Sequence, residues 1–254
     1  MEHPFHLQGK NILITGASSG IGRQCAISCS ALGANLILFG RNMEALNATE
    51  LACHPAVKKY RVSVDMQAHE AMANAVRESV GALGKIDGVI HCAGISTTLP
   101  LRMIRPDKLR TYLEVNVIGA IELTRLLVKP AHFAKTGGSI VFISSVMAQV
   151  GERGKTIYSI TKGAVEAGVR SLALELAGKH IRVNGVAPGV VETPMSEQAA
   201  YSQNTEALER ITAMHPLGLG QTTDVANGCI YLLSDASRWV TGTTLTIDGG
   251  YTAH

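Results

Sequence analysis

The stretch "NILITGASSGIGR", residues 11–23, joins a short apolar run to a glycine-rich turn and then to the start of a predicted helix. The apolar run at 11–15 has the length and composition of a buried strand. Glycine permits a tight turn there, and the free backbone amides at a helix start attract anionic oxygens. The spacing is GxxxGxG, which departs from the GxGxxG dinucleotide fingerprint. The strand, turn and helix together nevertheless favour a turn that binds a dinucleotide through Gly16, Ser18, Ser19, Gly20, Ile21 and Gly22.

Six further strand-like runs follow along the chain, each short and apolar on both faces. They cover residues 35–39, 60–64, 86–91, 139–144, 181–187 and 244–248. Segments with a helical pattern lie between them, among them 22–33, 72–84, 108–128 and 163–178. Alternation of strand and helix predicts right-handed crossovers and a parallel α/β sheet that is doubly wound, with helices on both faces. A chain of 254 residues with 46% apolar content fits one domain, residues 1–254.

Composition argues against several classes of partner. The formal net charge is only +3 and the charges are spread out, so no surface for nucleic acid or anionic lipid is indicated. The first ten residues contain no apolar signal core, and no apolar run is long enough to span a membrane, so we expect a cytoplasmic protein. The five cysteines are odd in number and include no CxxC pair, and His3 with His6 would form half a site at most. We expect reduced thiols and no metal.

The end of the second predicted strand, "LFGRN", bears on the choice of cofactor. Dinucleotide folds that bind NAD usually place an acid here, on the adenosine ribose hydroxyls. Gly40 occupies that place and Arg41 follows. A missing carboxylate and a planar cation both favour a 2′-phosphate, so the sequence predicts NADP(H) in preference to NAD(H). The ordinary explanation of Arg41 is a solvated residue at a helix start.

A tyrosine and a lysine sit four positions apart in "TIYSITKGAV", residues 156–165. If this segment is helical, Tyr158 and Lys162 project from the same face. A nearby ammonium lowers the pKa of a phenol by favouring the phenolate, which makes tyrosine a usable acid–base group. The spacing alone occurs by chance in many helices.

Two polar residues strengthen this interpretation. Ser145 stands at the end of a predicted strand, where parallel sheets bind ligands, and Asn116 lies among apolar helical neighbours. Each also has a purely structural explanation: Ser145 could cap the following helix, and Asn116 could satisfy the backbone of a bent helix.

With these residues in place, the sequence resembles the short-chain dehydrogenase/reductase family along nearly its whole length. The matching motifs are "TGASSGIG", Asp65, "CAG" at 92–94, Asn116, Ser145, "YSITK" at 158–162, "VAPGVVETPM" at 186–195 and "VTGTTLTIDGG" at 240–250. The resemblance implies a Rossmann-like domain with seven parallel strands, usually a homotetramer, that moves hydride between a nicotinamide and an alcohol or carbonyl carbon.

The resemblance also implies a role for each matching residue. Tyr158 would be the acid–base group, Lys162 would lower its pKa and hold the nicotinamide ribose, Ser145 would polarise the carbonyl, and Asn116 would anchor a water relay. Asp65 would bind the adenine amino group. Beyond the glycine turn and Arg41, the implied cofactor contacts are Asp65, Met66, Cys92, Ala93, Gly94, Tyr158, Lys162, Pro188, Gly189, Val191 and Thr193. Cys92 departs from the asparagine that the family commonly has, so one hydrogen bond is missing or replaced.

The substrate is less well defined by sequence. The family pattern lines its pocket with residues near 95–100, 146–155 and 189–195, and residues 193–216 form either a flap over the substrate or an extra surface helix. The overall pattern is similar to 3-oxoacyl-[acyl-carrier-protein] reductases, which predicts a ketone substrate, free or carrier-bound. Alternatives are a sugar or polyol dehydrogenase and a dinucleotide-sensing regulator without chemistry. A nucleotide-sugar epimerase of the extended type is disfavoured by length.

Overall fold

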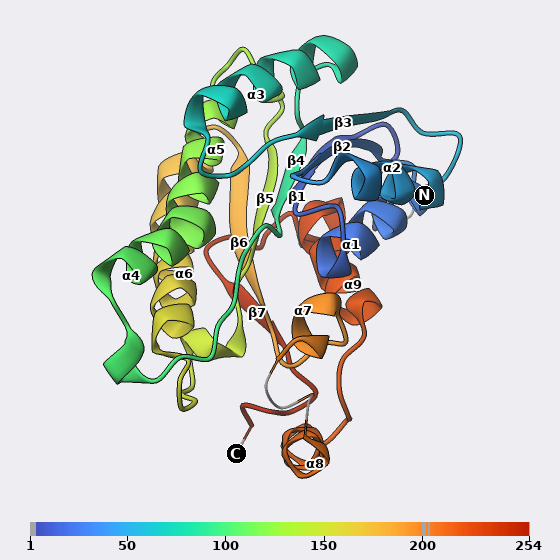
Figure 1. Ribbon diagram of the computed structural model, residues 1–254. Helices are drawn as coiled ribbons and strands as arrows, with labels where there is room; N and C mark the ends of the chain where they lie inside the picture. The colour runs from blue at the N-terminus through green and yellow to red at the C-terminus, as the bar shows by residue number, and fades with distance from the viewer. Residues whose placement is uncertain (1–3, 200–201, 203, 254) are drawn as a thin grey trace.

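The computed structural model describes residues 4–199, 202 and 204–253, and its centre is a sheet of seven parallel strands (Figure 1). The strand order is β3-β2-β1-β4-β5-β6-β7. The strands are β1 Asn11–Thr15, β2 Asn35–Gly40, β3 Lys59–Ser63, β4 Gly88–His91, β5 Gly138–Ile143, β6 Ile181–Pro188 and β7 Thr244–Ile247. Each predicted strand is present with ends within two residues of those expected, so the predicted doubly wound fold is confirmed.

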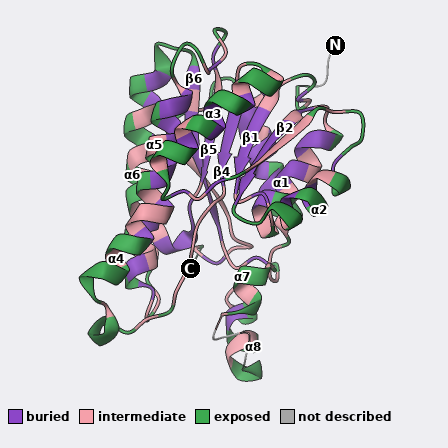
Figure 2. Cartoon of the chain, turned by 45° about the horizontal axis from the view of Figure 1, so that its top comes forward, coloured by how far each residue is buried: buried purple, intermediate pink, exposed green. Residues whose placement is uncertain are grey.

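Helices cover both faces of the sheet, and the inner strands bury side chains on both sides. On β2, Ile37 and Phe39 pack into the cluster shared with α3, α5 and α6, whereas Leu36 and Leu38 pack into the cluster shared with α1, α2 and α9. The five inner strands are accordingly almost continuously buried, whereas the edge strands β3 and β7 are only partly buried (Figure 2). The helices are α1 Gly20–Ala31, α2 Met43–Ala52, α3 His69–Leu83, α4 Pro106–Leu113, α5 Gly119–Leu127, α6 Thr156–Ala177, α7 Pro194–Glu197, α8 Thr205–Ala213 and α9 Thr222–Leu233.

The predicted helix at 108–128 is interrupted. Helices α4 and α5 are joined by one π-helical turn, Glu114–Ile118. Such a wide turn is frequent at functional sites and accommodates a polar group inside a helix. Periodicity alone does not reveal it, since the apolar pattern runs through.

Chain order places the reversal point of the sheet between β1 and β4. From β1 the chain moves outward to β2 and β3, and then crosses back to β4 on the other side of β1. Ligands of doubly wound sheets bind in the crevice at the carboxyl ends of such strands. The turn after β1 and the segment after β4 therefore form the edge where a cofactor is expected.

The segment 193–216 contains two helices, α7 and α8. In α8 only Ile211 is buried, and Figure 1 shows this helix at the far end of the molecule from α3. Residues 200, 201 and 203 of the segment lie outside the described part. The extra helix is therefore present, and the function of the segment as a flap stays a prediction.

The described residues contain no helix long and apolar enough to cross a membrane and no group of three or more His, Cys, Asp or Glu side chains able to hold a metal. The five cysteines are free thiols. His3, part of the half-site considered from sequence, lies outside the described residues.

The central strands set the stability of the sheet, and Ile90 of β4 tests this because its side chain is fully buried. We expect Ile90→Ala to lower the free energy of unfolding by about 2–5 kcal/mol, from lost burial and the cavity left behind. Leu51→Ala on the exposed face of α2 is the matched control, with an expected change within about 0.5 kcal/mol. Urea unfolding of both variants measures the difference, and equal losses would contradict a core centred on β4.

Candidate active site

The glycine turn after β1 is shaped by two close backbone approaches. Gly16 has φ +65°, and a Cβ there would lie 2.9 Å from the Ala93 amide nitrogen. A Cβ on Gly22 would lie 2.3 Å from the carbonyl oxygen of Gly16. Helix α1 begins at Gly20, and its N-cap residue Ser19 makes no side-chain capping hydrogen bond. The first amides of α1 therefore remain available to an anionic ligand.

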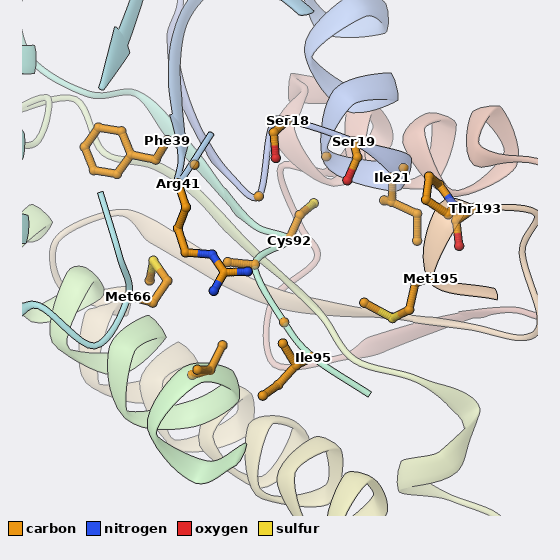
Figure 3. A pocket seen from close by; sticks show the side chains of 18 of the residues that line it. Ser18, Ser19, Ile21, Phe39, Arg41, Met66, Cys92, Ile95, Thr193 and Met195 are labelled. Atoms are coloured by element: carbon orange, nitrogen blue, oxygen red, sulfur yellow. The ribbon is translucent and has the colours of Figure 1, made fainter. Parts of the chain in front are cut away.

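These amides border a cavity of about 240 Å³, shown in Figure 3. Its walls come from the glycine turn and from the segments that follow β2, β3 and β4. The Arg41 side chain extends over the cavity between Met66 and Cys92 in Figure 3, and Asp65 is the one carboxylate among the described lining residues. A Cβ at Gly40 would lie 3.1 Å from Leu46 Cδ2, so a larger residue there would require Leu46 to shift slightly.

A second cavity, of about 180 Å³, adjoins the first. Both are lined by Ile21, Cys92, Gly94, Thr193 and Met195. The second is also lined by Ser145, Tyr158 and Lys162, which come from the end of β5 and from α6. Three polar groups of the predicted catalytic set thus lie in one cavity that opens onto the predicted cofactor cavity.

Among these three groups, the Lys162 ammonium is held in place by a hydrogen bond to the backbone. The helical segment assumed from sequence is present as α6, and the buried ammonium donates a 2.7 Å hydrogen bond to the carbonyl oxygen of Ile143. Its Nζ lies 5.5 Å from the centroid of the Tyr158 ring. Burial lowers the pKa of Lys162 to about 8, and the nearby Cys92 acts in the opposite direction. The site therefore holds a cation close to a phenol in a poorly solvated place.

Asn116 lines neither cavity. Its side chain instead bonds to the backbone of Ile95, a residue that lines the first cavity. Asn116 sits in the π-turn, where its Oδ1 accepts from the amide of Ile95 at 2.8 Å and its Nδ2 donates to the carbonyl of Ile95 at 2.9 Å. Its Nδ2 also donates to Thr161 Oγ1, whose hydroxyl donates to the carbonyl oxygen of Tyr158. The helix is interrupted here by a π-turn, but the Asn116 side chain bonds to Ile95 and Thr161 rather than to its own helix backbone.

Ser145 both caps the turn that follows β5 and faces the second cavity, so the two interpretations made from sequence apply together. Its Oγ accepts a 3.2 Å hydrogen bond from the Met147 amide and so caps the 3₁₀ turn Val146–Ala148. Its hydroxyl proton has no acceptor within the part of the chain that the structure describes. The proton is thus available to a molecule in the second cavity.

All the predicted cofactor residues line one cavity or the other. At the departure from the family pattern, the neighbouring Cys25 thiol and burial together hold the pKa of Cys92 well above its ordinary value. Sequence reasoning named the segment 146–155, where Met147 and Glu152 line the second cavity, but it did not single out Lys155. The lining residues that belong to no predicted contact or pocket segment are Phe39, Val64, Val115, Ile143 and Ser144.

Comparison with known proteins agrees with this geometry. Residues 16–252 match the family model described as enoyl-(acyl carrier protein) reductase. The chain is 35% identical to the 3-oxoacyl-[acyl-carrier-protein] reductase FabG of Thermotoga maritima, covering 97% of this chain and 99% of that protein. It is 32% identical to L-rhamnose 1-dehydrogenase (NADP(+)) of Thermoplasma acidophilum, with 96% of each covered.

A solved structure of a putative short-chain alcohol dehydrogenase from Sinorhizobium meliloti superposes with a TM-score of 0.92, at 28% identity over 99% of both chains. The chain belongs to the short-chain dehydrogenase/reductase family, whose members are oxidoreductases that use a nicotinamide cofactor. The curated relatives differ in substrate, since they also include a 7alpha-hydroxysteroid dehydrogenase of Escherichia coli at 33% identity over 97% of this chain and 95% of that one.

The buried ammonium of Lys162 predicts a dependence of stability on pH. Its pKa is lowered in the folded chain, so between about pH 8 and its ordinary 10.5 the unfolded chain binds more protons. Unfolding therefore becomes harder as pH rises through this window, by about 3 kcal/mol from this group. Urea unfolding from pH 7 to 10.5 should show this contribution as the difference between the unaltered protein and Lys162→Met, because the buried cysteines, whose pKa values are raised, act in the opposite direction in both proteins. Identical pH profiles in the two proteins would contradict the burial argument.

Proposed function

We propose that this protein is an NADP(H)-dependent oxidoreductase that transfers hydride between the nicotinamide and a ketone or secondary alcohol. The observation that carries the proposal is the placement of Ser145, Tyr158 and Lys162 in one cavity that adjoins the cavity of the glycine turn. The residues present fit a dinucleotide, since close backbone approaches and free α1 amides suit a pyrophosphate. Assembly as a homotetramer and a cytoplasmic location stay predictions.

The nicotinamide, when bound, supplies or accepts the hydride. Tyr158 donates its phenolic proton to the carbonyl oxygen as negative charge develops there, and Ser145 donates a hydrogen bond to the same oxygen. The Lys162 ammonium favours the phenolate that results, and it holds the cofactor ribose. Asn116 fixes the Ile95 backbone beside the cavity and offers the anchor for a water relay that returns a proton to Tyr158.

The first substrate class is a 3-oxoacyl compound, with a thioester as the form suggested by the similarity to the Thermotoga maritima reductase. Sugars and polyols form the second class, because the second cavity offers Ser96 and Glu152 as polar partners and a rhamnose dehydrogenase is among the relatives. A regulator that only senses the dinucleotide would not need a phenol, a hydroxyl and an ammonium gathered in one cavity.

Arg41 makes the cofactor preference testable. We expect Arg41→Ser to weaken NADPH binding by about 10- to 100-fold, the range for lost hydrogen bonds to a charged group. NADH binding should stay within about twofold, since NADH lacks the 2′-phosphate. Paired fluorescence titrations with both cofactors measure the two constants, and Arg77→Ser on the exposed face of α3 is the control. Equal affinity of the unaltered protein for NADH and NADPH would contradict the preference.

Tyr158 carries the chemical step. Tyr158→Phe should reduce kcat by about 10²- to 10⁴-fold, the contribution of a positioned proton donor, with the NADPH dissociation constant changed little. The readout is absorbance of the reduced nicotinamide with a panel of ketones that includes a 3-oxoacyl thioester. Tyr60→Phe on β3 is the matched control and should keep full activity. A Tyr158→Phe protein with full activity would instead support a sensing function.

A further inference from the structure

The second cavity contains another buried lysine, Lys155, that the mechanism above does not use. Its side chain is 8% exposed and lines the cavity with Ser145 and Tyr158. The contrast with Lys162 is clear, because the Lys162 ammonium has a carbonyl partner at 2.7 Å. Within the described part of the chain, the Lys155 ammonium has no hydrogen bond and no ion pair.

The position of Lys155 is electrostatically unfavourable. Burial lowers its pKa, and Glu152 is the neighbouring charge that acts against this. Lys155 is also the N-cap residue of α6, a helix of 22 residues with no acidic side chain in its first turn. A helix N-terminus carries partial positive charge, which disfavours a cation there. The helix therefore contributes nothing to holding this cation, and Glu152 is the nearby charge that favours it.

The same features make the position suitable for an anion. The ammonium and the first amides of α6 both favour negative charge, and the buried setting strengthens their effect. Glu152 lines the same cavity, yet its carboxylate is not within the 4.0 Å ion-pair distance of the ammonium. An anion that enters this cavity would be the first close partner of Lys155.

The distance between Lys155 and Tyr158 limits the anion to one near the reacting carbon. The two residues are one helical turn apart, a spacing that places their Cβ atoms about 5–6 Å from each other. A carbonyl held by Tyr158 and Ser145 therefore leaves only a few bonds between itself and a group on Lys155. The phosphate of a long carrier arm would lie too far along the substrate to reach this ammonium.

We propose that Lys155 binds a substrate carboxylate, so that the enzyme acts on a short oxo acid or the matching hydroxy acid. One ammonium matches the single charge of a carboxylate, whereas a phosphate dianion would need further donors. The inference rests on the proposed oxidoreductase function and narrows its substrate: in a 3-oxoacyl skeleton, the free acid places a charged oxygen where a thioester has a neutral one.

The test compares acids with their neutral esters. The probes are 2-, 3- and 4-oxopentanoate and their methyl esters, each assayed with saturating NADPH. We expect kcat/KM for the best acid to exceed that of its ester by at least about tenfold. Lys155→Met should lower kcat/KM for that acid by about 10- to 100-fold and leave the ester within about threefold. Lys155→Arg should restore most of the activity on the acid.

Two further measurements separate binding from a structural function of Lys155. The Lys155 ammonium makes no hydrogen bond or ion pair with the described chain, so Lys155→Met should not lower the melting temperature while it lowers activity on the acid. Glu152→Gln should strengthen acid binding, because it removes a negative charge from the same cavity. Lys179→Met, on the exposed turn after α6, is the control for loss of a positive charge.

The outcomes distinguish this inference from the proposed function. Equal use of acids and esters, or an equal loss on both in Lys155→Met, would overturn the carboxylate site and leave the oxidoreductase standing. If no ketone oxidises NADPH, the proposed function fails. Binding is then decided by thermal shift with the oxo acids alone: stabilisation of the unaltered protein but not of Lys155→Met supports the site, and stabilisation of neither overturns it.

Discussion

The hydrogen bond from the Lys162 ammonium to the carbonyl oxygen of Ile143 fixes the position of α6 against the end of β5. Tyr158 lies one turn earlier on α6, and Ser145 follows β5 by two residues. This bond therefore sets where the phenol and the hydroxyl can meet a common substrate atom. A buried ammonium tolerates few alternatives, because each lost partner would leave a charge unsatisfied in a poorly solvated place. The geometry of the cavity is accordingly tied to the sheet.

Positively charged groups gather around the two cavities at the carboxyl ends of the strands. The amides at the start of α1, the Arg41 guanidinium and the two buried lysines all contribute, while Asp65 and Glu152 are the carboxylates that line the two cavities. The chain as a whole carries a net charge of only +3, so this gathering of positive charge is local. It suits a phosphorylated dinucleotide in one cavity and an oxyanion in the other, since both reactant and transition state then meet fixed donors.

The strands could be predicted from sequence, and so could the meeting of Ser145, Tyr158 and Lys162 at one cavity, because both depend on local pattern. Apolar runs define the strands, and residues at strand ends share one edge of a parallel sheet. The π-turn around Asn116 could not be predicted, because the apolar periodicity continues through it. Lys155 lies in the predicted pocket segment 146–155 but could not be singled out, because its burial depends on how that segment folds over the cavity. A single lysine before a helix gives no such signal.

The relatives act on thioesters, sugars and steroids at comparable identity, which shows that overall similarity carries little information about substrate. The reason is architectural. The residues proposed for hydride transfer lie at the end of β5 and on α6. The walls that face the rest of the substrate come from the loop before α6 and from the segment after β6. Loops of this kind change without disturbing the sheet. A charged side chain in such a wall says more about the substrate than overall sequence identity does. A substrate that covers the charge without pairing with it would bind at a cost in free energy. Lys155 imposes this constraint on the cavity.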